Sequence, residues 1–416
     1  MRIYLETYGC TSNNGDSAKI KDMLIQYGHE VVGNIEHAEL TVLNTCTVTQ
    51  TTENKILKRI NNLAESGMKI AVLGCMVAAQ PVIMGQLRAE HNCIAVPDFG
   101  KNAACNLLKI IGQDGEAKNP DLQSSHETTQ VVKISDGCVG NCSYCIVKKA
   151  KGELKSRLPE DIVKDVEMCI LNGAKEIQIT SQDTACYGMD IGYRLHDLLK
   201  DLCRIEGEFM IRVGMMNPFT AIDIVDGLVD AFQSDKIFKF LHIPVQSGSD
   251  KVLADMNRGH SASDFIFIVD RFRNAFPDLT LSTDFIIGYP TETEDDHIKS
   301  INMLNAAGAD RVNITRFSKR PKTLAYSLYD MPDRIKKDRS REMSKAHLKL
   351  SEIRNKRWIG KRVNVLITEH GKNNTSIGRD ITYKNIVVKD KLSLGTNRQV
   401  LIVDAVPMYL IGECIN

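Results

Sequence analysis

Three cysteines lie within eight residues, in the segment Cys138-Val139-Gly140-Asn141-Cys142-Ser143-Tyr144-Cys145. Their spacing is C-x3-C-x2-C, and the segment directly follows a predicted strand at 131–134. Three thiolates in one short loop can bind three of the four irons of a 4Fe-4S cube. Cys138, Cys142 and Cys145 are therefore predicted to be metal ligands at a reactive, catalytic centre.

The fourth iron of such a cube would have no protein ligand. It can chelate the amino and carboxylate groups of S-adenosylmethionine (SAM), and an electron from the reduced cluster then splits the S–C bond to give a 5′-deoxyadenosyl radical. Zinc is the main alternative, but a zinc site usually needs a fourth Cys or His nearby. The nearest histidine, His126, precedes the strand and fits that role poorly.

A second set of cysteines is spread along the first part of the chain. Cys10, Cys46 and Cys75 each follow a predicted apolar strand, at 3–5, 40–44 and 70–74. Ligands of open parallel sheets bind outside the carboxyl ends of the strands, so the three thiols could converge. A second 4Fe-4S cluster would use them as metal ligands, whereas the alternative is that they are simply small buried residues.

Polar side chains follow the later strands and could bind a cofactor. Gln182 and Asp183 come after the strand at 176–180, and Gln246 and Ser247 come after the strand at 240–243. Asp284 lies within the strand at 281–287. These five residues are the candidates for SAM binding, although polar strand ends also serve as helix caps or are simply solvated.

The elements that must position these residues form three units. Residues 1–112 alternate strands with helical stretches such as 17–27 and 53–65, which indicates a parallel α/β domain. Residues 113–130 are polar and are predicted to be a linker. Residues 131–357 carry six strand–helix units, which favours a partial (β/α)6 barrel with strands at 131–134, 176–180, 210–213, 240–243, 281–287 and 311–314.

Residues 358–416 have a different pattern from the rest of the chain. Short apolar strands at 363–367, 386–388 and 400–403 are joined by polar loops, which is typical of a small all-β barrel. The predicted fold class is therefore α/β: an N-terminal parallel α/β domain, a partial barrel and a small C-terminal all-β barrel. Trp358, the only tryptophan, is expected to be a core residue at the domain junction rather than a base-stacking one.

Charge is distributed unevenly along a chain whose net charge is only +1. Residues 316–362 contain 16 Lys or Arg against five Asp or Glu. Such segregation favours a polyanion such as RNA, although a solvated helix is the plainer alternative. The predicted RNA-binding residues lie on a helix at 332–356 or just after it: Lys336, Lys337, Arg339, Arg341, Arg354, Lys356 and Arg357.

Composition excludes a membrane-embedded chain. Hydrophobic residues make up 43% of the sequence, and no window approaches the roughly 18 continuous apolar residues of a membrane span. The first residues, Met1-Arg2-Ile3-Tyr4-Leu5-Glu6, contain no long apolar segment of a secretory signal. We expect a cytoplasmic protein, in which clustered cysteines more often bind metal than form disulfides.

At these residues the chain resembles the methylthiotransferases, a family of radical SAM enzymes. The likeness covers nearly the whole length and is carried by Tyr8-Gly9-Cys10-Thr11-Ser12-Asn13, Leu43-Asn44-Thr45-Cys46-Thr47-Val48, the C-x3-C-x2-C loop with Lys148 to Arg157, and Thr180-Ser181-Gln182-Asp183-Thr184. Residues 358–416 resemble the TRAM domain, a small RNA-binding barrel. The closest resemblance is to the archaeal and eukaryotic type that acts on N6-threonylcarbamoyladenosine at position 37 of tRNA.

This resemblance implies two 4Fe-4S clusters, SAM, and tRNA with its anticodon loop as the partner, together with an electron donor. One SAM would methylate a sulfur on the cluster of Cys10, Cys46 and Cys75. A second SAM, on the other cluster, would give the radical that takes hydrogen from carbon 2 of the adenine. Isopentenyladenosine in tRNA or a ribosomal protein are alternative substrates, and a non-catalytic metal-bearing RNA-binding protein is a third reading.

One departure from the family pattern concerns a turn. The family usually has Pro-Gly-Thr after the last barrel strand, and this chain has Pro321-Lys322-Thr323. A residue with a Cβ is strained there if the turn requires a positive φ.

Overall fold

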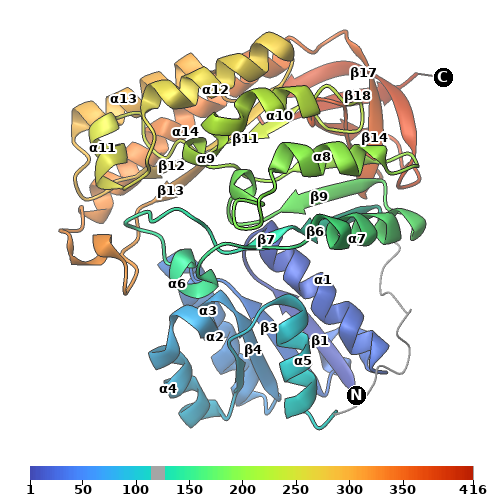
Figure 1. The fold of residues 1–416 in the computed structure, drawn as a ribbon, viewed down its shortest axis with the longest axis vertical. Helices are drawn as coiled ribbons and strands as arrows, with labels where there is room; N and C mark the ends of the chain where they lie inside the picture. Colours follow the sequence, from blue (N-terminus) through green and yellow to red (C-terminus); the bar gives the residue numbers. More distant parts are fainter. Residues whose placement is uncertain (114–126, 416) are drawn as a thin grey trace.

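The computed structural model describes residues 1–113 and 127–415. Figure 1 shows an N-terminal α/β lobe at the bottom, a larger lobe above it, and a small barrel of strands beside the larger lobe at the C-terminal end of the chain. Residues 114–126 of the predicted linker lie outside the described residues, and residues 129–130 belong to strand β6 (Thr129–Lys133). No described helix combines the length and the apolar character needed to cross a membrane.

The N-terminal lobe is built on a five-stranded parallel sheet with the order β2-β1-β3-β4-β5. Its strands are β1 Arg2–Thr7, β2 Glu30–Val32, β3 Leu40–Thr45, β4 Ile70–Gly74 and β5 Ile94–Val96. Its helices are α1 Thr11–Gln26, α2 Gln50–Glu65, α3 Cys75–Ala79, α4 Pro81–His91 and α5 Gly100–Ile110, with a 3-10 turn at Ile35–His37. Strands β3 and β4 are buried throughout because helices cover both faces of the sheet.

The second lobe contains six parallel strands in sequence order, as expected for a partial (β/α)6 barrel. The strands are β6, β9 Glu176–Thr180, β10 Met210–Val213, β11 Phe240–His242, β12 Thr280–Ile287 and β13 Arg311–Arg316. They form two three-stranded sheets, β6-β9-β10 and β11-β12-β13, which a parallel bridge between Ile211 and Ile237 joins. The outer helices are α7 Pro159–Leu171, α8 Leu195–Arg204, α10 Val225–Ala231, α12 Ala262–Ala275, α13 Glu294–Ala307 and α14 Asp333–Lys356.

Short elements lie at the carboxyl ends of these strands. They are α6 Val147–Lys151, α9 Pro218–Ala221, α11 Asp250–Asp255, the hairpin of β7 Ser135–Asp136 with β8 Lys155–Ser156, and 3-10 turns at Thr184–Cys186, Ile222–Ile224 and Leu324–Ser327. The loop with the three clustered cysteines runs from β7 to α6, and so lies on top of the partial barrel.

The C-terminal unit is a closed barrel with the order β14-β15-β16-β18-β17. Its strands are β14 Arg362–His370, β15 Ser376–Arg379, β16 Asn385–Val388, β17 Asn397–Val406 and β18 Tyr409–Cys414. Three of them were predicted, and the other two each contain a glycine that weakened the apolar pattern. Trp358 packs in the core of this barrel, as expected, and is only 6% exposed.

This small barrel docks against the amino ends of the six parallel strands. The hydroxyl of Tyr383 donates to Glu176 Oε1 at 2.8 Å, and Lys384 Nζ donates to Asp310 Oδ1 at 2.8 Å. The guanidinium of Arg311 donates to Asn385 Oδ1 at 2.8 Å. The C-terminal barrel therefore covers the lower end of the partial barrel, whereas the cysteine loop lies at the opposite, carboxyl end.

Candidate active site

All six cysteines singled out in the sequence line one cavity of about 450 Å³ between the N-terminal lobe and the partial barrel. Cys10, Cys46 and Cys75 come from the carboxyl ends of three neighbouring strands of the five-stranded sheet. The other three come from the loop over the partial barrel: Cys138, Cys142 and Cys145. Two sets of thiols that are remote in sequence therefore face the same enclosed space.

The first set is held by close backbone packing. Gly9 and Gly74 have φ values of +121° and +89°, which favour glycine. A Cβ on Gly9 would lie 3.0 Å from Cys46 Cβ, and one on Gly74 would lie 2.7 Å from the carbonyl oxygen of Thr45. The side-chain amide of Asn13 donates to the carbonyls of Tyr8 and Thr45, which links the segments that carry Cys10 and Cys46.

The second set lies in a loop that is anchored on the partial barrel. The backbone N–H of Ser143 donates to the carbonyl of Met256 at 3.0 Å, and its hydroxyl lies 2.9 Å from the hydroxyl of Tyr289. Gly137 has φ +75°, and a Cβ there would overlap the carbonyl oxygen of Glu153 at 1.9 Å. These contacts fix both ends of the C-x3-C-x2-C loop.

Burial controls the ionisation of most of these thiols. It raises the pKa of Cys75 to about 12 and that of Cys145 to about 11, and it also raises the pKa of Cys46. Cys138 differs, because a hydrogen bond from the Cys186 thiol lowers its pKa. A thiolate is the form that binds metal, so metal binding in this cavity must displace protons from buried thiols.

Several residues of the cavity were missed by the sequence reasoning. Arg258 is buried, and its guanidinium donates to Cys142 Sγ at 3.3 Å and to Asn217 Oδ1 at 2.9 Å. Asn313 donates to Asp284 Oδ1 at 2.7 Å, and His242 Nε2 lies 3.1 Å from the same oxygen. These residues come from different strands and loops, so no local spacing in the sequence marks them.

The structure brings four of the five candidate SAM-binding residues to the cavity wall: Gln182, Asp183, Gln246 and Asp284. Gln246 has φ +73°, an uncommon conformation for a non-glycine residue. Asp183 already accepts hydrogen bonds from the N–H groups of Ala185 and Asn217 and from the hydroxyl of Thr220.

Ser247 is the exception among the five. It is fully buried behind the wall, where its hydroxyl accepts from the N–H of Ser249 at 3.2 Å and lies 3.4 Å from Ser300 Oγ. Ser247 is not among the residues that line the cavity, its hydrogen bonds support a packing role, and its contact with the cofactor stays a prediction.

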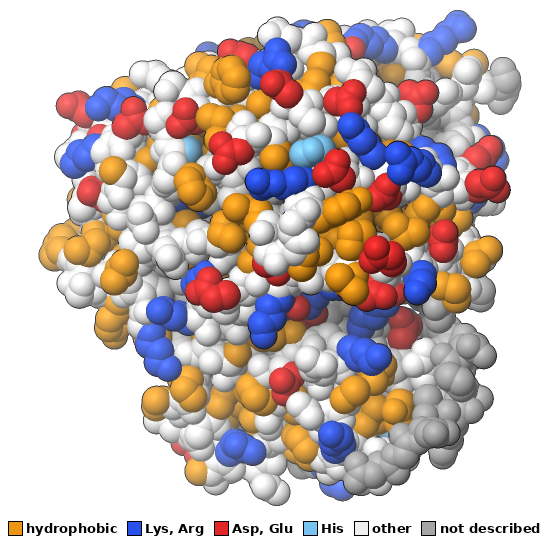
Figure 2. Space-filling view, viewed as in Figure 1, with side chains coloured by type: hydrophobic (Ala, Val, Ile, Leu, Met, Phe, Trp, Pro, Cys, Tyr) orange, Lys and Arg blue, Asp and Glu red, His pale blue; other side chains and the backbone are white. Residues whose placement is uncertain are grey.

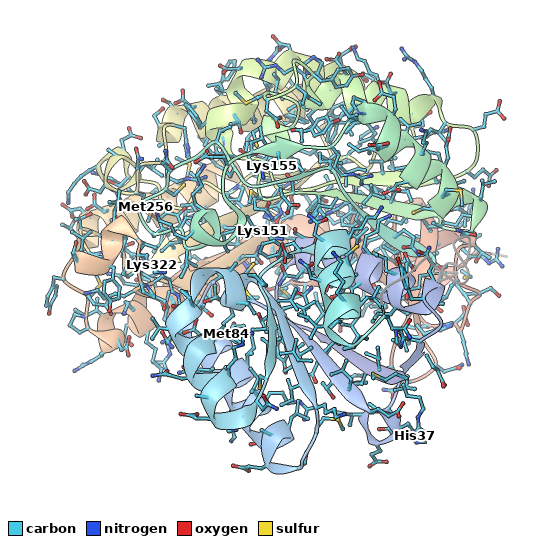
Figure 3. All side chains as sticks on the ribbon, turned by 60° about the horizontal axis from the view of Figure 1, so that its bottom comes forward. His37, Met84, Lys151, Lys155, Met256 and Lys322 are labelled. Carbon is cyan, nitrogen blue, oxygen red and sulfur yellow. The ribbon has the colours of Figure 1, made fainter. Side chains whose placement is uncertain are left out.

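Buried ion pairs hold the two lobes together around the cavity. The Nζ of Lys151 lies 2.8 Å from Asp16 Oδ2, and both side chains are almost inaccessible to solvent. The guanidinium of Arg320 pairs with Glu53 in the same way. Figure 2 shows Lys and Arg side chains along the junction of the lobes, and Figure 3 places Lys151 at that junction.

The turn that departs from the family pattern has the expected strain. Lys322 has φ +63°, so a side chain occupies a position that glycine would fill without cost. The turn follows Arg320, and Figure 3 shows Lys322 and Met256 on the same side of the molecule. The N–H of Ala325 donates to the carbonyl of Ser143, so this loop packs directly on the cysteine loop.

The structure corrects part of the predicted RNA-binding set. Lys336 is buried against Asp330, Arg339 is buried against Glu292, and Arg354 pairs with Asp310. They lie on the face of α14 that packs on the partial barrel, since a helix repeats every 3.6 residues and must bury one face. The exposed members of the set are Lys337, Arg341, Lys356 and Arg357.

The donors of both sets are thiols, which are the usual ligands of iron–sulfur clusters. Within residues 1–113 and 127–415, no three His, Cys, Asp or Glu side chains come together as they would around one metal ion. Cubane ligands bind different irons and are therefore further apart than the ligands of a zinc ion. All twelve cysteines are free thiols, so both sets are available as ligands.

Comparison with known families agrees with this arrangement. Residues 132–304 match the radical SAM superfamily, residues 2–95 match the uncharacterized protein family UPF0004, and residues 356–415 match the TRAM domain. Two solved structures share the fold over 78% of this chain. They are the methyltransferase TsrM from Kitasatospora setae (TM-score 0.55, 14% identity, 77% of that chain) and the cobalamin-dependent radical enzyme OxsB (TM-score 0.52, 12% identity, 54% of that chain).

Full-length relatives are more similar. A probable threonylcarbamoyladenosine tRNA methylthiotransferase of Archaeoglobus fulgidus is 38% identical over 99% of this chain and 98% of its own length. One from Methanocaldococcus jannaschii is also 38% identical, over 100% of this chain and 97% of its own. The human threonylcarbamoyladenosine tRNA methylthiotransferase is 32% identical over 88% of this chain and 66% of its own length. This chain therefore belongs to the radical SAM family of the threonylcarbamoyladenosine tRNA methylthiotransferases.

Proposed function

We propose that this protein transfers a methylthio group to carbon 2 of N6-threonylcarbamoyladenosine at position 37 of tRNA. The observation that carries the proposal is the shared cavity, because both cysteine sets face it. A transfer that needs a radical centre and a separate sulfur donor requires both beside one substrate. The family relationship supports the same activity, since the relatives carry this name.

Cys138, Cys142 and Cys145 would hold one 4Fe-4S cluster, and Cys10, Cys46 and Cys75 would hold the second. Bound there with SAM, the clusters would supply the 5′-deoxyadenosyl radical and the methylated sulfur. The protein then has to hold the two sets of thiols in fixed positions. The strand ends fix the first set of thiols, the anchored loop fixes the second, and the buried ion pairs between the lobes keep them facing each other.

Other cavity residues would orient SAM and the substrate. Gln182, Asp183, Gln246 and Asp284 are the candidates for SAM, because they line the cavity and all but Asp284 follow the carboxyl ends of barrel strands. Gln182 Nε2 also donates to Ser12 Oγ at 3.2 Å, so it joins the barrel to the N-terminal lobe. Arg258 places a positive charge beside Cys142, because its guanidinium donates to Cys142 Sγ at 3.3 Å.

The RNA partner would be held outside the cavity. The TRAM domain and the exposed cations Lys337, Arg341, Lys356 and Arg357 are the proposed contacts for the tRNA phosphates, with the anticodon loop entering the cavity. We also propose a cytoplasmic location, an electron donor as second partner, and domains at 1–112, 131–357 and 358–416. The separate sheets of these three parts support that division.

Nucleoside analysis of tRNA tests the function directly. In a strain that lacks the gene, the 2-methylthio form of the nucleoside should disappear and its unmodified parent should accumulate. Persistence of the methylthio form would point to another substrate, such as a ribosomal protein. Anaerobic reconstitution complements this experiment: about eight irons per chain and reductive SAM cleavage are expected, whereas zinc or no metal would favour a non-catalytic RNA-binding protein.

A further inference from the structure

The floor of the cavity contains an arginine, Arg212, whose charge has no partner among the described residues. Arg212, on β10, lines the cavity. Its Nε is buried, and the side chain forms no hydrogen bond or ion pair with any residue that the structure describes. Its guanidinium lies over the ring of Phe240, with the guanidinium carbon 5.2 Å from the ring centroid. A buried N–H donor without an acceptor, such as this Nε, is costly, so a ligand in the cavity that supplies acceptors to the guanidinium is expected.

The surroundings of Arg212 increase the excess positive charge. Arg311 approaches the same Phe240 ring at 5.5 Å, and it donates only to neutral acceptors, the carbonyl of Tyr383 and Asn385 Oδ1. Burial lowers the pKa of Arg311 to about 10, and the nearby cations Arg379 and Arg212 contribute to this shift. Two guanidiniums therefore flank one aromatic ring, and neither pairs with a carboxylate of residues 1–113 or 127–415.

The acidic groups nearby are engaged elsewhere. Glu176 Oε1 accepts from Gln178 Nε2 at 2.7 Å and from the hydroxyl of Tyr383 at 2.8 Å. Asp284 Oδ1 accepts from Asn313 and faces His242. Neither carboxylate pairs with Arg212, so the described part of the floor lacks an anion for it.

We propose that Arg212 is a carboxylate receptor for the ligand that fills the cavity. A guanidinium offers paired N–H donors that match the two oxygens of a carboxylate, and the ring of Phe240 keeps the fork in one plane. This inference rests on the proposed function, which supplies two carboxylates: the threonyl group of the modified nucleoside and the methionyl group of SAM.

The position of Arg212 favours the threonyl group. Arg212 lies below the strand ends. The N–H of Met216 donates to the carbonyl of His242, the last residue of β11, so the end of that strand is level with Met216. Arg212 comes four residues before Met216 and is therefore further down. The cysteine loop lies above the strand ends, and the open iron that takes the methionyl carboxylate would be there. A flexible threonylcarbamoyl tail on the adenine could extend downward to the floor. Arg212 would then distinguish this nucleoside from an unmodified or a purely hydrocarbon-modified adenosine.

Binding of synthetic anticodon stem–loops tests the proposal without turnover. One RNA carries N6-threonylcarbamoyladenosine, and the other carries the same group with threoninol in place of threonine, which removes the carboxylate. Both are titrated against the reconstituted wild type, Arg212→Gln and Arg212→Lys, with Arg204→Gln as a control because Arg204 lies on an exposed helix end. Iron content and thermal midpoint verify that each variant is folded and loaded.

Loss of the carboxylate should weaken binding to the wild type about 100-fold, as expected for a buried charge pair that loses one partner. Arg212→Gln should bind the native RNA about as weakly as the wild type binds the threoninol RNA. On the threoninol RNA the substitution should weaken binding only a few-fold further, because the interaction with the carboxylate is already absent. Arg212→Lys should recover part of the affinity. If Arg212 were mainly structural, Arg212→Gln would weaken the binding of both RNAs by the same factor. That result would exclude the threonyl carboxylate as the group that Arg212 binds, and the proposal would then be overturned if the SAM titration also showed no effect of the methionyl carboxylate.

A second titration, with SAM and with decarboxylated SAM, tests whether Arg212 binds the methionyl carboxylate of SAM instead of the threonyl carboxylate. If Arg212→Gln weakens SAM about 100-fold and leaves decarboxylated SAM unaffected, the receptor serves the methionyl carboxylate. If neither carboxylate shows coupling to Arg212, the proposal is wrong. Failure of the proposed function gives a different signature: the wild type would form no methylthio product on the native RNA, whatever the binding data show.

Discussion

The buried pair between Arg320 and Glu53 should be essential for holding the two lobes together. Arg320 follows the last strand of the partial barrel, and Glu53 lies on α2 of the N-terminal lobe, just after Cys46. Their side chains are 1% and 2% exposed. Arg320 also donates to Thr47 Oγ1 at 2.8 Å and to Gln50 Oε1 at 2.9 Å. The replacement Arg320→Met removes all of these donors and leaves the Glu53 carboxylate buried.

The expected cost is set by that carboxylate. Breaking a buried ion pair by removing one partner typically costs about 3–5 kcal/mol. Glu53 keeps three neutral donors, the hydroxyl of Thr47, Gln50 Nε2 and Gln80 Nε2, so the lower end of this range applies. A loss of about 3 kcal/mol corresponds to roughly a 100-fold rise in local opening, because about 1.4 kcal/mol is a factor of ten.

Hydrogen exchange measured by mass spectrometry is the appropriate assay, because it reports opening of one segment rather than of the whole chain. Peptides that cover 40–65 should exchange about 100-fold faster in Arg320→Met, whereas peptides that cover 280–287 should change little. The double variant Glu53→Gln with Arg320→Met should recover most of the protection, since no charge is then left buried. Unchanged exchange in the single variant, or equal damage in the double variant, would refute this reasoning.

The remaining predictions concern other parts of the molecule. Cys142→Ala should abolish 5′-deoxyadenosine formation, whereas Cys46→Ala should retain that cleavage and lose methylthio transfer; identical behaviour in well-folded variants would contradict the division between two clusters. Lys322→Gly should stabilise the protein by about 0.5–1 kcal/mol in thermal unfolding, because a left-handed non-glycine residue costs about 1–2 kcal/mol and glycine returns part of this as chain entropy; Lys322→Ala is the control and should bring no gain. Burial and the neighbouring Arg258 lower the pKa of His260 to about 4, below the 6.5 of an unfolded histidine. The contribution of this histidine to stability is therefore complete above pH 6.5 and is lost as the pH falls toward 4. His260→Asn should flatten that part of a curve of unfolding free energy against pH. Replacing Lys337, Arg341, Lys356 and Arg357 by Gln should reduce the slope of log K for tRNA against log salt by about 0.7–0.9 for each phosphate that no longer pairs with a cation, and an unchanged slope would exclude these residues from the interface.

The sequence alone determined much of the architecture and the identity of the main cysteines. Continuous apolar runs such as 70–74 and 281–287 predicted buried parallel strands, because such strands are covered on both faces. The C-x3-C-x2-C loop could be recognised because its three cysteines are close together in the sequence. Cys10, Cys46 and Cys75 could be predicted to lie together for a related reason. Cys46 and Cys75 directly follow a strand, Cys10 comes three residues after one, and parallel strands end at one edge of the sheet.

Tertiary structure decided what depends on contacts between distant segments. Only the folded chain shows that both cysteine sets share one cavity, that Arg258 approaches Cys142 and that Arg212 has no acidic partner among the described residues. It also separates the cations of α14, because a charge count cannot tell that Arg339 turns inward to Glu292 while Arg341 faces solvent. Side-chain partners across 45 or more residues leave no periodic trace in the sequence, since packing and not spacing selects them.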